Sequence, residues 1–248
     1  MSLLKIEDIN KSYGDFWAVN HVSFDLQEGE MLALIGPNGA GKSTTFNMIG
    51  GQTQPNNGSI LFKNRSLLGL SADKIWALGI GRTFQIAEIF SSLTVLENVQ
   101  LALQIALRNK IALFNHGDTD LQDEALLLLK QVDMVENAHT AASEIAYGDV
   151  KRLELAMALA NHPTLLLMDE PTAGMSPTER IAMMALTKKI AQEKNMAVLF
   201  TEHSMDVVFK FADRIIVMAA GSIVATGTPE EIRNNALVKE IYLGNNKV

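Results

Sequence analysis

The sequence contains no cysteine among its 248 residues. Disulfides, thiol catalysis and cysteine-ligated metal sites are therefore excluded. Long apolar runs are absent as well, because no stretch approaches the roughly 18 consecutive apolar residues that a membrane span requires. The opening segment, residues 1–5, lacks the pattern of a secretory signal. We expect a cytoplasmic protein that does not span a membrane but can lie against one through a partner.

Positively charged residues are also fewer than negatively charged ones. The chain has 21 lysines and arginines against 28 aspartates and glutamates, a formal net charge of −7. This balance argues against non-specific nucleic-acid binding and leaves room only for a local basic groove. Hydrophobic residues make up 48% and charged residues 20%, which favours a sizeable core over wholesale disorder. The length suits one large α/β domain, with or without an inserted subdomain.

A glycine-rich loop is the most informative feature that is present. Residues 36–43 read Gly-Pro-Asn-Gly-Ala-Gly-Lys-Ser, directly after the apolar run 31–35 and before a helix expected from Lys42. The pattern is G-x-x-x-x-G-K-[ST] in the order strand, loop, helix. Glycines let successive N–H groups point at phosphate oxygens, and the helix N-terminus adds unpaired donors and partial positive charge.

The residue types in this loop favour a nucleoside triphosphate as ligand. Lys42 is expected to neutralise the β- and γ-phosphates, and the Ser43 hydroxyl to ligate Mg²⁺. The alternative is a glycine-rich turn that binds nothing, and the register of Lys42 and Ser43 argues against it. The residues expected to bind the nucleotide here are Gly36, Pro37, Asn38, Gly39, Ala40, Gly41, Lys42, Ser43 and Thr44.

The first half of the chain changes its apolar spacing twice. Residues 3–34 predict short antiparallel strands, and residues 60–62 predict another strand after a turn at 56–58. Residues 86–145 have mostly helical spacing, with a capping box at 94–97. A largely helical subdomain inserted in an α/β core is the predicted arrangement.

The second half predicts buried strands that alternate with helices. Apolar runs at 165–168 and 197–200 flank a helical pattern at 180–193. A strand, a crossover helix and a second strand imply a parallel sheet. A hairpin is expected around 219–222, and the capping signals at 228–231 begin a further helix.

Two acidic residues follow the first of these strands. Asp169 and Glu170 lie at the carboxyl end of 165–168, where α/β proteins place their ligands. Asp169 is expected to hold Mg²⁺, and Glu170 to polarise an attacking water. An acidic pair before Pro171 is also common in solvated loops, so the pair indicates hydrolysis only in combination with the loop at 36–43.

Two polar residues are candidates because of where they lie. His203 follows the strand 197–200, where its imidazole could bond a γ-phosphate oxygen or orient Glu170. Gln85 precedes the helical insert, where its amide could contact Mg²⁺ or the water. A histidine satisfied elsewhere and a surface glutamine are the simpler interpretations of these two residues taken alone.

Several segments together then resemble one family in their order and spacing. They are Tyr13, the loop 36–43, Gln85, Ala146-Tyr147-Gly148-Asp149, Asp169-Glu170 and His203. The chain is similar to the nucleotide-binding subunit of an ATP-binding cassette (ABC) transporter over nearly its whole length. Within that superfamily it most resembles the ATP-binding subunits of branched-chain amino acid importers. The segments that carry this finer resemblance are 82–85, 146–148, 152–154, 173–177, 201–206 and 241–244.

The resemblance implies a fold and a division of the chain. The fold is a P-loop NTPase core with a mixed sheet, an N-terminal antiparallel β subdomain and an inserted α-helical subdomain. Residues 1–248 would form one nucleotide-binding domain. Its ATP-binding core would comprise 1–85 and 160–248, and its helical subdomain with the signature segment would comprise 86–159.

The resemblance also implies a mechanism. Two subunits would face each other head to tail and trap two ATP molecules, each between loop 36–43 of one subunit and Ala146, Tyr147 and Gly148 of the other. Tyr13 would stack on adenine, although a partly buried strand-end aromatic is the simpler interpretation of it. Lys42, Gln85, Glu170 and His203 would act in hydrolysis, and Ser43, Gln85 and Asp169 would hold Mg²⁺.

The same resemblance implies partners and a location. The partners would be integral membrane permease subunits, a second ATPase subunit that is identical or related, and indirectly an external solute-binding protein, with no nucleic acid. The location would be the cytoplasmic face of the cell membrane.

Some residues depart from the general family pattern. Ala146 has no hydroxyl for the γ-phosphate, Asp149 adds negative charge, and Met157 stands where arginine is usual. A regulatory nucleotide-binding module with weak hydrolysis therefore stays open as an alternative. A soluble ABC protein without a transport role is a further alternative, and it fits poorly because the chain has neither a long coiled-coil insert nor two cassettes.

Overall fold

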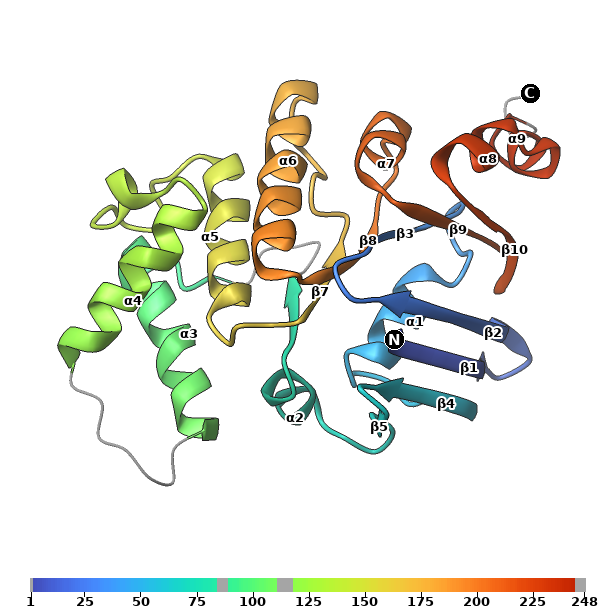
Figure 1. The fold of residues 1–248 in the computed structure, drawn as a ribbon, viewed down its shortest axis with the longest axis horizontal. Helices are drawn as coiled ribbons and strands as arrows, with labels where there is room; N and C mark the ends of the chain where they lie inside the picture. The colour runs from blue at the N-terminus through green and yellow to red at the C-terminus, as the bar shows by residue number, and fades with distance from the viewer. Residues whose placement is uncertain (1, 84–88, 111–117, 244–248) are drawn as a thin grey trace.

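The computed structural model describes residues 2–83, 89–110 and 118–243. Its strands form two sheets, and its helices lie between them and around them (Figure 1). Helices α3 and α4 lie at the end of the molecule farthest from α8 and α9 (Figure 1).

The smaller sheet is antiparallel and has the order β2-β1-β4-β5. Its strands are β1 (Ser2–Tyr13), β2 (Phe16–Gln27), β4 (Asn57–Phe62) and β5 (Arg65–Ser66). Alternating side chains of β1, such as Leu4 and Ile6, are buried, which is the pattern of a sheet with one covered face. The prediction of antiparallel strands at the N-terminus is confirmed, but β1 and β2 are 12 residues each rather than short.

The larger sheet has the order β10-β9-β3-β8-β7-β6. Its strands are β3 (Met31–Ile35), β6 (Ile80–Thr83), β7 (Leu165–Asp169), β8 (Ala197–Thr201), β9 (Arg214–Ala219) and β10 (Ser222–Gly227). All neighbouring pairs are parallel except β9 and β10, which form the expected antiparallel hairpin. The prediction that 31–35 is antiparallel is wrong, because β3 pairs in parallel with β8 and β9.

The pairing of β3 has a physical reason. All five residues of β3 are fully buried, and a strand covered on both faces suits the centre of a parallel sheet. Met31, Ala33 and Ile35 pack into the core on one face, and Leu32 and Leu34 pack into the core on the other. The second core also contains Phe46 of α1 (Lys42–Ile49) and Ile6 of β1, so α1 packs between the two sheets.

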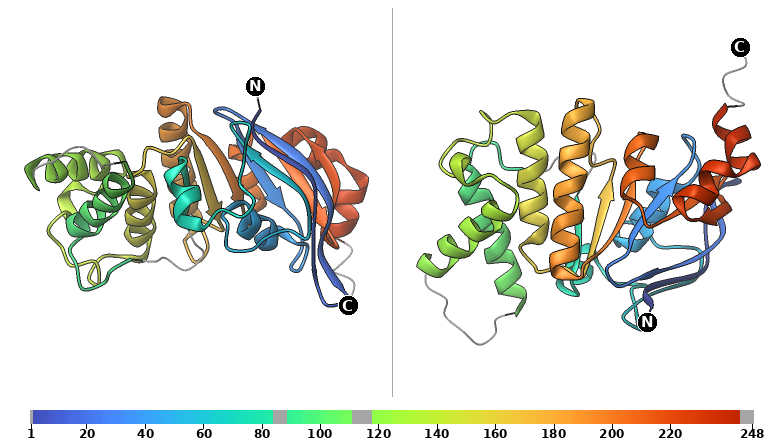
Figure 2. Two further views of the ribbon diagram at one scale, coloured as in Figure 1. Left: turned by 90° about the horizontal axis from the view of Figure 1, so that it is seen from below. Right: turned by 45° about the horizontal axis from the view of Figure 1, so that its top comes forward.

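The remaining helices pack around the large sheet and beyond its β6 edge. They are α2 (Ala72–Ala77), α3 (Val95–Lys110), α4 (Asp118–Gln131), the 3₁₀ turn η1 (Val135–Asn137), α5 (Tyr147–Leu159), α6 (Pro177–Lys194), α7 (Met205–Phe211), α8 (Pro229–Asn234) and α9 (Ala236–Leu243). Helices α5 and α6 run side by side, with α3 and α4 beyond α5 (Figures 1 and 2). No helix in the described part of the chain is long and apolar enough to cross a membrane.

The capping signals in the sequence are present as hydrogen bonds. At Thr94 the backbone N–H donates to Glu97 Oε2 at 2.7 Å, and the Glu97 N–H donates to Thr94 Oγ1 at 3.2 Å. The box at Thr228 and Glu231 has the same two bonds. These local bonds satisfy N–H groups that a helix start leaves unpaired, which explains why the boundaries were visible in the sequence.

Candidate functional site

The candidate site lies at the carboxyl edge of three adjacent strands. β3, β8 and β7 are consecutive in the large sheet, and the glycine-rich loop, His203 and Asp169-Glu170 follow them respectively. Residues that are far apart in the sequence are therefore brought to one edge. This is the edge at which open α/β sheets place their ligands.

The glycines of the loop occupy positions that other residues would not fit. Gly39 and Gly41 have φ angles of 77° and 100°, in the left-handed region. A Cβ at Gly41 would lie 2.3 Å from the carbonyl oxygen of Ala18, and one at Gly36 would lie 2.2 Å from that of Met218. The loop is thus pressed against β2 on one side and β9 on the other.

Lys42 begins helix α1 and turns back into the loop. Its Nζ donates to the carbonyl oxygens of Gly36 at 2.7 Å and Pro37 at 3.1 Å. Only 7% of the residue is exposed. Burial lowers the pKa of Lys42, and the nearby charges of Glu170 and Asp169 act in the opposite direction. The ammonium group is thus held inside the loop, where its charge would stabilise a bound anion that carries several negative charges.

A cavity of about 220 Å³ lies in front of this loop. Glu170 forms one wall, and Phe16 and Ala18 of β2 form another. The residues that line it are Phe16, Ala18, Asn38, Gly39, Ala40, Gly41, Lys42, Ser43, Thr44 and Glu170. Most of the predicted phosphate loop therefore faces a single cavity together with the predicted catalytic carboxylate.

The aromatic side chain on this cavity wall is Phe16, which the sequence did not single out. Tyr13, the residue predicted to stack on adenine, pairs with Phe16 across the β1–β2 hairpin and is 55% exposed. The Lys11 ammonium lies 5.4 Å from the centre of the Tyr13 ring. The stacking role of Tyr13 stays a prediction, and the pattern Tyr13-Gly14-Asp15-Phe16 was the available signal for Phe16.

Thr201 connects the two acidic residues. Its hydroxyl donates to Asp169 Oδ1 at 2.6 Å and accepts a bond from the Glu170 N–H at 3.0 Å. Glu170 has a φ of 50°, a left-handed conformation that costs a non-glycine residue energy. Sequence reasoning had given Thr201 no role, and its place two residues before His203 was the only signal for it.

His203 lies against Glu170. Its Nε2 is 2.8 Å from Glu170 Oε1, and the two side chains are 49% and 19% exposed. The neighbouring Glu202 points the other way and accepts bonds from the N–H and hydroxyl of Thr172 at 2.9 and 2.6 Å. The structure thus brings together the carboxylate and the imidazole for which the sequence predicted a shared role.

The oxygen donors at this edge suit Mg²⁺, which prefers oxygen ligands and takes some of them from substrate phosphates. The Ser43 hydroxyl is exposed in the cavity, and the Asp169 carboxylate lies close enough to influence Lys42. No cluster of three or more His, Cys, Asp or Glu side chains suited to a metal occurs within the described residues. Gln85, the third predicted ligand, lies outside the described residues.

The segment Ala146 to Gly148 lies apart from this cavity. Helix α5 begins at Tyr147, so Ala146 is its N-cap. Ala146 and Gly148 line a second cavity of about 190 Å³ together with Met175 and Glu179 at the start of α6. Tyr147 lies over Gly174, where an added Cβ would be 3.2 Å from its ring. The two cavities have no lining residue in common.

These observations agree with the comparisons with known proteins. The ABC transporter family profile matches residues 19–173, and that of the branched-chain amino acid ATP-binding cassette transporter matches residues 222–247. The chain therefore belongs to the ABC transporter family, as an ATP-hydrolysing cassette that binds nucleotide.

Several relatives are similar to this chain over almost its whole length. The high-affinity branched-chain amino acid transport ATP-binding protein LivG of Salmonella typhimurium is 39% identical, and BraF of Pseudomonas aeruginosa is 36% identical, each over 98% of both chains. The lipopolysaccharide export system ATP-binding protein LptB of Haemophilus influenzae is 34% identical over 98% of both chains. A solved ABC transporter cassette in its ADP conformation has a TM-score of 0.88 at 29% identity, covering 98% of this chain and 99% of its own.

Proposed function

We propose that this chain hydrolyses ATP to power the import of branched-chain amino acids or a related small polar solute. The observation that carries the hydrolytic part is the Glu170–His203 contact of 2.8 Å beside the cavity that holds Lys42. The substrate rests on the relatives: those named for branched-chain amino acid transport are 36–39% identical, against 34% for the lipopolysaccharide exporter. The C-terminal match at residues 222–247 points the same way.

The residues divide the chemistry between them. The loop N–H groups and the Lys42 ammonium hold the β- and γ-phosphates, because both supply fixed positive charge in a buried setting. Glu170 orients and polarises the attacking water, and His203 holds that carboxylate and bonds the γ-phosphate. Ser43 and Asp169, with Gln85 as the resemblance implies, would hold Mg²⁺, which would supply charge neutralisation at the phosphates.

We propose further that two cassettes act together, head to tail. The support is the separation of the two cavities within one chain: each lacks what the other contains. The N-terminus of helix α5 and Gly148 lie at the second cavity, where they would suit the γ-phosphate of an ATP held by a partner. A similar solved structure, a dimeric bacterial ABC transporter cassette, is 28% identical with a TM-score of 0.80 and covers 91% of this chain and 98% of its own.

A third apolar cavity suits the membrane partner. It measures about 360 Å³ and lies among α2, α3 and α5, with Trp76, Ile105 and Met157 in its walls. Phe90 and Ile105, also in its lining, are 51% and 49% exposed, so the cavity opens onto an apolar patch of the surface. We propose that a short helix of an integral membrane permease subunit docks here, which would hold the chain at the cytoplasmic face of the membrane. The helical segment 86–159 would then transmit movement to the permease, and the core at 1–85 and 160–248 would bind the nucleotide.

One observation favours a second function. The N-cap of α5 is Ala146, so no side-chain hydroxyl caps this helix or reaches a phosphate, and Asp149 places a negative charge in its first turn. Both features weaken the binding of a phosphate group at the second cavity. A regulatory module that dimerises on ATP but turns it over slowly is the corresponding alternative.

The substitution Glu170→Gln distinguishes these functions. An ATPase should release phosphate about a hundredfold or more slowly, because the amide cannot accept a proton, while ATP binding and an ATP-dependent dimer persist. The control is Glu193→Gln, the same change at an exposed position on α6. Phosphate release that Glu170→Gln leaves unchanged would reject the role of Glu170, and negligible release by the unmodified chain with its membrane partners would favour the regulatory module.

The transport assignment has its own test. Mild-detergent purification from native membranes should recover the chain with two polytopic membrane proteins and a second cassette subunit. Recovery from the soluble fraction alone would leave the ATPase chemistry in place and overturn transport.

A further inference from the structure

Arg180 lies between the two cavities of one chain and bonds to a residue beside each of them. Arg180 lies in the first turns of α6, and its Nε donates to the carbonyl oxygen of Met175 at 2.9 Å. Its Nη1 donates to the Ser204 hydroxyl at 2.6 Å. Met175 lines the second cavity, and Ser204 directly follows His203, which lies against Glu170 at the first cavity.

We propose that Arg180 is a positioning residue that couples the two ATP sites of the dimer. This inference rests on the proposed function, since the two cavities of one chain would belong to different ATP molecules. A change at the second cavity would move the turn 173–176, and the guanidinium would pass that displacement to Ser204 and His203.

The geometry favours coupling because the connection is stiff at each point. The guanidinium is planar and holds its N–H donors in a fixed fork, so one bond cannot shift without the other. Its base is also fixed: Ser176 and Glu179 form a capping box, and the Arg180 N–H donates to the Ser176 carbonyl at 3.0 Å. Both groups that the guanidinium bonds are neutral, a carbonyl and a hydroxyl, so the contact sets positions rather than neutralising a buried charge.

Tyr147 connects the turn to the other subunit's ATP. Its ring lies over Gly174, which precedes Met175, and it is 49% exposed at the start of α5. A ligand that presses on Tyr147 would therefore press on the turn. The chain of contacts runs from Tyr147 through Gly174 and Arg180 to His203.

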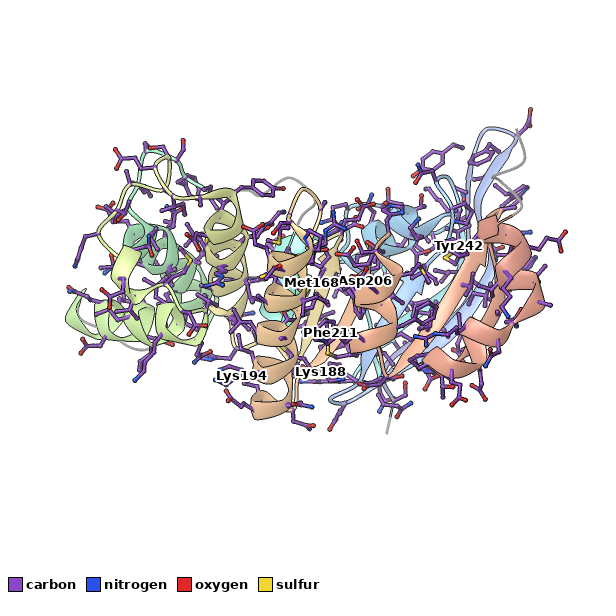
Figure 3. All side chains as sticks on the ribbon, turned by 90° about the horizontal axis from the view of Figure 1, so that it is seen from above. Met168, Lys188, Lys194, Asp206, Phe211 and Tyr242 are labelled. Carbon is purple, nitrogen blue, oxygen red and sulfur yellow. The ribbon has the colours of Figure 1, made fainter. Side chains whose placement is uncertain are left out.

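A second contact between α6 and α7 provides the matched control. Lys188 donates to the Phe211 carbonyl at 3.2 Å and to Asp213 Oδ1 at 3.4 Å. Phe211 is the last residue of α7 and Ser204 is its N-cap, so this contact lies at the opposite end of α7 from Ser204 (Lys188 and Phe211 are labelled in Figure 3). Lys188→Met removes a cation that joins the same two helices but touches neither cavity. It should lower thermal stability without altering the response to ATP.

The first test is ATP hydrolysis by the full chain in its dimer. Arg180→Met should lower kcat about tenfold and reduce the Hill coefficient for ATP toward about 1, with the affinity of the monomer for ATP unchanged. Arg180→Lys should rescue little, because one ammonium cannot make both bonds in the same geometry. Cooperative hydrolysis that is the same in Arg180→Met and the unmodified chain would overturn the proposal.

The second test needs no activity, so it separates this inference from the proposed function. Tyr147→Ala perturbs the turn, and hydrogen–deuterium exchange then reports on residues 201–206. The perturbation should speed exchange there in the unmodified and Lys188→Met backgrounds but not in Arg180→Met. Equal transmission with and without Arg180 would overturn the coupling even if the ATPase assignment stands. A chain that hydrolyses no ATP but shows this difference would refute the function and retain the coupling.

Discussion

Thr201 shows how much one hydroxyl controls at this site. The residue is fully buried, and its Oγ1 donates to Asp169 and accepts from the Glu170 backbone at the same time. Only a hydroxyl can do both with one atom. Thr201 thus fixes the Asp169 carboxylate directly and the Glu170 backbone, with its positive φ, from which the second carboxylate extends.

We therefore expect Thr201→Val to damage hydrolysis more than ATP binding. Valine keeps the shape but offers neither bond, so Glu170 relaxes from its position. kcat should fall about 10- to 100-fold, because small misplacements of a catalytic group are costly. Stability should fall by about 1–3 kcal/mol from the unpaired polar groups.

The control is Thr187→Val, another fully buried threonine whose hydroxyl donates to the Met183 carbonyl within α6. Steady-state phosphate release and thermal unfolding measure both variants. If Thr201→Val and Thr187→Val lose the same stability and neither loses kcat, Thr201 does not position Glu170.

Among the helices, α9 has an unexpected contact with the phosphate loop. Tyr242 lies where α9 meets the strands (Figure 3), and its hydroxyl is hydrogen-bonded to the backbone of Gly36. Burial raises the pKa of Tyr242 to about 12, and the backbone of Gly36 acts in the opposite direction. The Gly36 carbonyl meanwhile accepts from Lys42. The first glycine of the loop thus lies between Lys42 and Tyr242.

Removing the Tyr242 hydroxyl should loosen the loop. In Tyr242→Phe the ring still packs, so the fold persists, but the contact between the hydroxyl and the Gly36 backbone is lost. We expect the Kd for ATP to rise about 2- to 10-fold, the effect of one ordinary hydrogen bond, with kcat at saturating ATP little changed.

Isothermal titration with ATP measures this, and Leu237→Ala, at an exposed position on the same helix, is the control. An unchanged Kd in Tyr242→Phe would mean that α9 packs against the core without supporting the loop.

The helices and strands also show which parts of the fold can be predicted from the sequence and which cannot. Helix starts at Thr94, Ser176 and Thr228 depend on bonds between residues three apart, so their signals are local. The pairing of β3 depends on which strands lie beside it, and its five apolar residues read equally well as part of an antiparallel run. Its true neighbours, β8 and β9, lie more than 160 residues away in the chain.

The site follows the same rule. The phosphate loop was predictable because its glycines, Lys42 and Ser43 act within eight consecutive residues. Glu170 and His203 were candidates because each follows a predicted buried strand, and the resemblance to a family strengthened their assignment to hydrolysis. Phe16 and Tyr242 were missed because their importance comes only from what the fold places opposite them.

For the molecule as a whole, the nucleotide cavity lies between the two sheets. Phe16 and Ala18 come from β2 of the small sheet, and Glu170 and the loop come from the ends of β7 and β3 of the large one. Arg214 of β9 joins the sheets elsewhere, through bonds to Glu30 Oε1 at 2.7 Å and to the Asp25 carbonyl at 2.6 Å. A ligand that touches both walls should stabilise their association beyond this existing link.

ATP should therefore raise the stability of the whole chain and protect both walls together. A ligand that binds only the folded state at 100 times its Kd contributes about 2.7 kcal/mol, which for a chain of this length is a rise in Tm of about 5 to 11 °C. The measurement uses Glu170→Gln, so that ATP persists during the scan, with Lys42→Ala added to abolish binding as the control. Hydrogen exchange should slow in the β1–β2 hairpin and in α1 at the same ATP concentration. If protection appears in α1 but not in the hairpin, the small sheet takes no part in binding, and the placement of Phe16 and Tyr13 at the nucleotide is wrong.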